Sequence, residues 1–125
     1  MKLKIPVKTL VIVVFVVLLV ASYLLIFVAT HTVTIITNSA RDVPIYVDGV
    51  FKGYARLGKP LTIEVPRGNH TFTTSKVIDG YVFAEWGLCK SVSEYTGENY
   101  KRLTGNIELT IYIDRNIVLL IYYTL

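Results

Sequence analysis

Two histidines, His31 and His70, and one cysteine, Cys89, are the residues of this 125-residue chain best suited to binding a metal ion. A metal site would require partners at short ligand spacing, such as H-x-H, H-x3-H or a histidine within an acidic cluster. No such pattern occurs in the sequence. We therefore expect no metal and no cofactor, and we expect both histidines to be structural. A single cysteine also excludes an internal disulfide framework.

Acid–base and nucleophilic chemistry have equally little support. Asp42 and Asp48 stand where turns favour aspartate, because its side chain bonds nearby backbone amides. Ser91 and Ser93 lack the G-x-S-x-G setting of a hydrolase nucleophile, and no glycine-rich phosphate loop is present. The sequence thus predicts a protein that is not an enzyme.

The charge distribution argues against nucleic acid as a partner. The chain has a formal net charge of +4, but Lys2, Lys4 and Lys8 supply most of it. From Thr30 onward the basic and acidic residues nearly balance. A basic groove for nucleic acid is therefore not expected.

An uncharged apolar segment, residues 10–29, follows these three lysines. A helix of that length spans about 30 Å, the thickness of a bilayer's hydrocarbon core. The sequence predicts a cytoplasmic tail at residues 1–9, a transmembrane helix at 10–29 and an extracytoplasmic domain at 30–125, oriented by the lysines. The lipid bilayer is accordingly an expected partner, with the protein a single-pass, signal-anchored component of the cell membrane.

The apolar segment has three alternative interpretations besides an uncleaved anchor. A cleaved secretory signal usually has a shorter apolar core, although Ala21 could serve as an early cleavage site. A lipoprotein is disfavoured because no cysteine follows the apolar run closely. A pilin-like leader would require a small residue before that run, where Lys8 and Thr9 stand.

The body of the chain alternates apolar and polar residues, as half-buried strands do. Clear examples are Val43-Ile45-Val47, Leu61-Ile63-Val65 and Leu109-Ile111-Ile113. Turn signals separate these runs, and Asp48-Gly49 is the sharpest, because a two-residue hairpin turn needs the positive φ that glycine adopts freely. We expect about eight short strands forming a small antiparallel β-sandwich.

Two family resemblances accompany this pattern. Ile45-Tyr46-Val47-Asp48-Gly49, followed by Gly53 and by the strand that ends in Pro66-Arg67-Gly68-Asn69-His70, resembles a PEGA domain over residues 33–81. Asn38 to Val43 depart from the corner expected of that family. The segment Gly80-Tyr81-Val82-Phe83-Ala84-Glu85-Trp86 is similar to cell-surface β-repeats that read G-Y-x-F-x-x-W. Both resemblances imply a non-catalytic β domain at the outer face of a cell.

Three places are candidates for interaction. Residues 90–105 form a long aperiodic segment suited to polar or sugar contacts through Tyr95, Tyr100, Lys101 and Arg102, or else a solvated excursion. The last strand is apolar on both faces, so it is either covered on both sides or offers Val118, Leu120 and Tyr122 for oligomerisation. Asn69-His70-Thr71 matches the N-glycosylation rule.

Together these features predict a membrane-anchored structural or interaction module of the cell envelope, with an envelope protein or polysaccharide as its partner. A glycan-binding or envelope-polymer-binding module, and a pilin-like filament or homo-oligomer subunit, are the alternatives.

Overall fold

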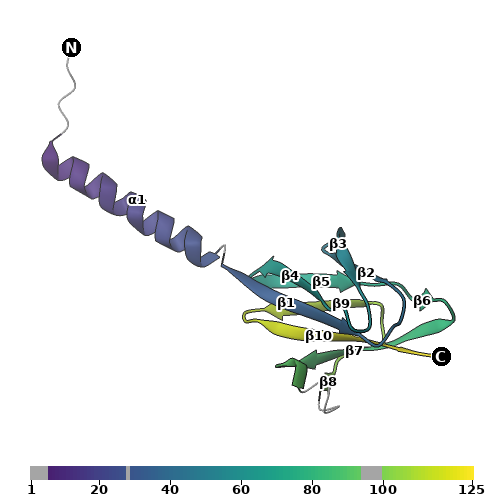
Figure 1. Cartoon of the computed structure of the whole chain (residues 1–125). Coiled ribbons are helices and arrows are strands. Elements are labelled where there is room, and N and C mark those ends of the chain that lie inside the picture. Colours follow the sequence, from purple (N-terminus) through teal and green to yellow (C-terminus); the bar gives the residue numbers. More distant parts are fainter. Residues whose placement is uncertain (1–5, 28, 94–99) are drawn as a thin grey trace.

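The computed structural model describes residues 6–27, 29–93 and 100–125, with helical side chains described through residue 22. One helix, α1 (Val7–Phe27), precedes a body of strands (Figure 1). The strands are β1 (Thr30–Thr37), β2 (Val43–Val47), β3 (Val50–Ala55), β4 (Leu61–Pro66), β5 (Gly68–Thr73), β6 (Val77–Ile78), β7 (Tyr81–Cys89), β8 (Lys101–Arg102), β9 (Glu108–Ile113) and β10 (Ile117–Thr124).

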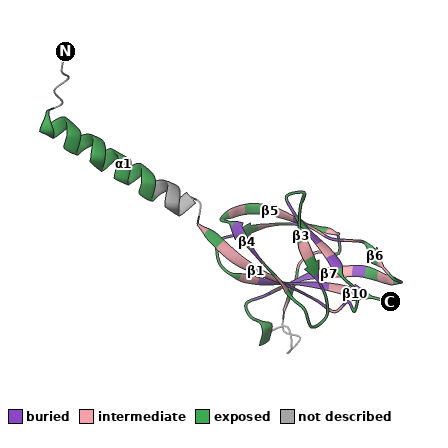
Figure 2. Ribbon diagram, turned by 45° about the horizontal axis from the view of Figure 1, so that its top comes forward, coloured by how far each residue is buried: buried purple, intermediate pink, exposed green. Residues whose placement is uncertain are grey.

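The strands form two sheets. Sheet A has the order β4-β1-β10-β7-β6, with β8 also paired to β7, and sheet B has the order β3-β2-β5-β9. Most neighbours are antiparallel, but β1 and β10 run parallel from Val33↔Ile117 to Thr37↔Ile121. Side chains from both sheets meet in one core, which includes Ile35, Ile45, Phe72, Trp86 and Ile121. The buried apolar side chains therefore lie along the strands, whereas the described side chains of α1 are exposed (Figure 2).

The fold differs from the predicted sandwich in two respects. The described residues contain ten strands where about eight were expected, because β6 and β8 have two residues each and so cannot show a two-residue periodicity. The sheets are also not purely antiparallel, since the first and last long strands pair in parallel. Alternation along a strand reports which side is buried but carries no information about the direction of the neighbour.

The predicted transmembrane helix at residues 10–29 is a further correction. In the part of the chain that the structure describes, no helix is both long and apolar enough to cross a membrane. This finding withdraws the signal-anchor and single-pass predictions, with the localisation and orientation derived from them.

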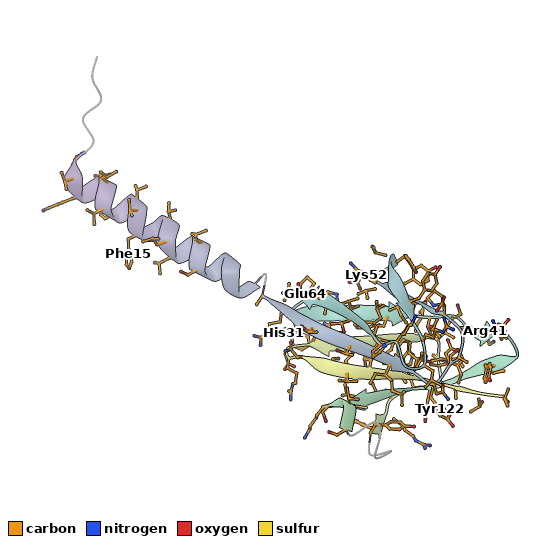
Figure 3. All side chains as sticks on the ribbon, viewed as in Figure 1. Phe15, His31, Arg41, Lys52, Glu64 and Tyr122 are labelled. Carbon is orange, nitrogen blue, oxygen red and sulfur yellow. The ribbon has the colours of Figure 1, made fainter. Side chains whose placement is uncertain are left out.

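Helix α1 nevertheless has an unusual surface. Its apolar side chains from Leu10 to Val20 are all at least half exposed, and they occur all around the helix. Phe15, for example, projects from the side of the helix (Figure 3). The helix is thus separate from the core that holds the two sheets together.

The last strand, β10, lies in the middle of sheet A, between β1 and β7. Leu119, Ile121 and Tyr123 face the main core. Val118 and Leu120 face the other side, where they form a second cluster with Ile36 and Cys89. Coverage on both faces explains why this strand is apolar throughout.

Candidate functional site

The turn at Asp48-Gly49 forms as the sequence predicts. Asp48 has φ 51° and Gly49 φ 80°, the left-handed pair that a two-residue hairpin turn requires. The turn joins β2 to β3 and places Val47 opposite Val50 and Tyr46 opposite Phe51. The pairing of the two residues on either side of the turn therefore follows directly from the turn type.

A β-bulge then changes the pattern along β3. Ile45 pairs with Gly53 while Tyr46 pairs with Phe51, so Lys52 is the extra residue. Without the bulge, Phe51 and Tyr54 would point to opposite faces, because they are three positions apart. With it, both lie on the outer face of sheet B beside Tyr46.

The result is a cluster of three exposed aromatic rings, Tyr46, Phe51 and Tyr54, which we call the aromatic patch. The Tyr46 and Phe51 ring centroids are 5.5 Å apart, and those of Phe51 and Tyr54 are 5.1 Å apart in an edge-on arrangement. Their exposed fractions are 37%, 47% and 57%, respectively. Single exposed apolar residues are ordinary, whereas three rings in mutual contact form a contiguous apolar surface.

A hydrogen-bonded latch holds the hairpin against its neighbour β5. The Asp48 carboxylate accepts the Thr71 N–H through Oδ1 (2.9 Å) and contacts His70 Nδ1 through Oδ2 (2.6 Å). The opposite ring nitrogen, His70 Nε2, lies 2.6 Å from the carbonyl oxygen of Pro66 and must donate to it, because a carbonyl can only accept. His70 thus links the two turns that the sequence singled out, in keeping with its expected structural role.

The latch gives the domain a predicted acid sensitivity. The bond from His70, followed by that from the Thr71 amide, lowers the pKa of Asp48 below its ordinary value. A carboxylate with a lowered folded-state pKa stabilises the fold above its unfolded-state pKa of about 3.9, and this contribution is lost as the pH falls through the folded-state value. We expect Asp48→Asn to lower the free energy of unfolding by about 1 kcal/mol at pH 7, because Asp48 is half exposed. The gap to the wild type should shrink below about pH 4.

Urea unfolding from pH 7 to pH 2 measures this gap. Asp79→Asn is the matched control, since Asp79 also has a positive φ and pairs with Arg41 at 2.8 Å, with both side chains mostly exposed. We expect that control to change stability by less than about 0.5 kcal/mol. A constant gap between wild type and Asp48→Asn across this pH range would contradict the assignment.

The predicted interaction loop is only partly assembled. Tyr95 lies outside the described residues. Tyr100 is half buried and packs against the second cluster of sheet A, and burial raises the pKa of its hydroxyl. Gly87 makes room for this ring, since a Cβ built there would lie 2.6 Å from Tyr100 Cδ2. Tyr100 therefore covers the outer face of sheet A.

Arg102 and Tyr122 lie close to Tyr100, around Glu85. Lys101 and Arg102 are exposed in β8, where Arg102 Nε is 3.3 Å from Glu85 Oε1. Val118 and Leu120 are buried, and only Tyr122 of that predicted surface is partly accessible. Asn69 is exposed in β5, so its modification stays a prediction. Within the described ranges, no group of three or more His, Cys, Asp or Glu residues could hold a metal ion.

The aromatic patch escaped the sequence analysis. The two-residue turn already implied that Tyr46 faces Phe51, which was the available signal. The bulge that adds Tyr54 had no such signal.

Comparisons with protein-family models, with curated proteins and with solved structures found no match for this chain. The resemblances to PEGA domains and cell-surface repeats therefore stay predictions.

Proposed function

We propose that the β domain is a non-catalytic interaction module that binds a partner protein through the aromatic patch. The observation that supports it is the contact of Tyr46, Phe51 and Tyr54 on one exposed face. Tyrosine and other large aromatic residues are enriched among the side chains that dominate binding energy at protein interfaces. Exposing three rings together costs solubility, which binding would offset.

The surroundings of the patch suit the same role. The latch of Asp48 and His70 fixes the turn of the β2–β3 hairpin on β5. A surface fixed before binding loses little conformational entropy on association.

The test is a triple variant, Tyr46→Ser, Phe51→Ser and Tyr54→Ser, compared with a matched control, Val77→Ser with Val82→Ser. The control removes two exposed apolar side chains that lie outside the patch. Val77 in β6 is 58% exposed, and Val82 in β7 is 44% exposed. The wild type and both variants are each bound to a resin and incubated with extract from the native cells. The retained proteins are quantified by mass spectrometry. We expect at least one protein retained by the wild type and the control to fall about tenfold or more with the triple variant, as loss of interface aromatics predicts.

Equal retention by all three forms would overturn the proposal, provided that circular dichroism shows each to be folded. Retention of a polysaccharide in place of a protein, lost in the triple variant, would replace the proposed partner with a glycan.

A further inference from the structure

Within the described residues, strand β9 forms an edge of sheet B that lacks the usual protection. Sheet edges expose unpaired backbone groups, and proteins usually block them with charged residues, proline, bulges or very short strands. Edge strand β3 carries Lys52 at its bulge (Figure 3), β4 ends in Pro66, and β6 and β8 have two residues each. Edge strand β9 is six residues long, contains neither proline nor glycine, and pairs with β5 in an uninterrupted register.

The hydrogen-bonding pattern shows which groups point outward from β9. The Thr74 N–H donates to the Ile107 carbonyl (3.2 Å) in line with the register of β5 and β9. Backbone bonding alternates along an antiparallel pair, so Leu109, Ile111 and Ile113 bond toward β5. Glu108, Thr110 and Tyr112 therefore direct their N–H and C=O groups toward the open edge.

Space is present beside this edge. A cavity of about 600 Å³ is lined by Glu108 and Thr110 together with Lys76 and Phe83. A second cavity, of about 550 Å³, borders the other end of the strand at Ile111 and Tyr112. Glu108, Thr110 and Tyr112, whose backbone groups point to the open edge, are also exposed residues.

We propose that β9 pairs with β9 of a second copy of this chain, antiparallel and about a two-fold axis at Thr110, so that sheet B continues across the dimer. All three outward-facing residues find partners only in the register that sets Thr110 opposite Thr110 of the other copy. That register gives six backbone hydrogen bonds and places Glu108 opposite Tyr112.

Charge complementarity favours this occupant over an unrelated strand. Arg67 Nε lies 3.4 Å from the Tyr112 hydroxyl, so the guanidinium is on one side of the Tyr112 ring and Glu108 of the other copy would be on the other side, within reach of long-range attraction. Each Glu108 is therefore attracted by a cation and avoids the second Glu108. Opposite charges on cross-strand neighbours stabilise pairing, and like charges oppose it.

Cross-linking tests the register directly on the full chain, in mild detergent so that association through α1 is limited. In a Cys89→Ala background, Thr110→Cys should form a covalent dimer with a thiol cross-linker that spans about 5 Å, because paired Cα atoms lie about 5.5 Å apart. Glu108→Cys should not, since the two cysteines would be about 14 Å apart. Thr62→Cys on edge strand β4 is the matched control and should stay monomeric. Absence of the Thr110 cross-link, or equal cross-linking at all three positions, overturns the proposal.

Three further variants separate pairing from folding. Thr110→Pro removes an outward N–H and the exposed hydroxyl contact to Thr71 (2.9 Å) but no backbone bond to β5. The monomer should therefore fold, while the dimer dissociation constant in sedimentation rises about tenfold or more. Glu108→Arg should weaken the dimer similarly, and Glu108→Arg with Arg67→Glu should restore it. A dimer insensitive to Thr110→Pro, or no rescue by the charge exchange, would contradict β9 pairing. Partner binding through the aromatic patch is measured separately and does not depend on this result.

Discussion

Trp86→Ala is expected to lower the free energy of unfolding by about 3–5 kcal/mol, the largest effect of any single substitution considered for this domain. Trp86 is fully buried, and its ring packs 5.7 Å from that of Phe83. Its indole N–H donates to the carbonyl of Asn106 at 2.8 Å, which fixes the crossing from sheet A to sheet B. Small domains are typically stable by only 5–15 kcal/mol, so the variant should be close to unfolding.

Urea unfolding followed by far-ultraviolet circular dichroism measures the loss, since Trp86 is the only tryptophan and its fluorescence disappears with it. Phe51→Ala, which truncates an exposed aromatic ring, is the control and should cost less than about 0.5 kcal/mol. A loss below about 1.5 kcal/mol for Trp86→Ala would contradict the described core.

Asn38→Ala is expected to cost roughly 2–4 kcal/mol through a different mechanism. Asn38 follows β1, and its side-chain amide donates to the Tyr123 carbonyl (2.8 Å) and accepts the Tyr123 N–H (2.8 Å). The amide thus imitates a strand and extends the pairing of β1 with β10 beyond its last backbone pair. Alanine would leave two backbone groups of a buried residue without partners, at about 1–3 kcal/mol each.

The same denaturation assay distinguishes the loss of these two hydrogen bonds from the loss of an ordinary exposed polar side chain. Asn69→Ala, at an exposed asparagine in β5, should change stability by less than about 0.5 kcal/mol. If Asn38→Ala were equally silent, water would be replacing both bonds, and the amide would not hold β10 in place.

Local sequence patterns predicted much of the body correctly. The alternation of Val43, Ile45 and Val47 matches their burial in β2, and Ile63 and Val65 are likewise buried in β4. The Asp48-Gly49 hairpin was also confirmed. Each of these features depends on residues close together in the chain.

The two bulges show where local reasoning fails. Phe83 and Trp86 are three positions apart, so simple alternation places them on opposite faces of β7. In the structure both are in the core, because Tyr122 pairs with Glu85 and Tyr123 with Phe83, which makes Ala84 an extra residue. The bulge at Lys52 brings Phe51 and Tyr54 to one face in the same way. One bulge thus completes the core and the other completes the candidate site.

The transmembrane prediction failed for a different reason, because it rested on the apolar character of residues 10–29 alone. Within the described residues, no helix is both long and apolar enough to cross a membrane. The prediction of an interaction loop at Tyr95, Tyr100 and Arg102 also relied on residue types. That interaction stays a prediction, and the packing of Tyr100 over Val118 and Leu120 is a contact that no local spacing could indicate.

The sequence by itself determined where strands and turns form and which residues alternate toward a buried side, because backbone preference and solvent exclusion act over a few residues. Tertiary structure alone decided that β1 pairs in parallel with β10, that bulges at Lys52 and Ala84 reverse the alternation, and that β9 is left as an unprotected edge. These features arise from pairing between segments distant in the chain. The energy of such pairing depends on both partners, so neither segment encodes it alone.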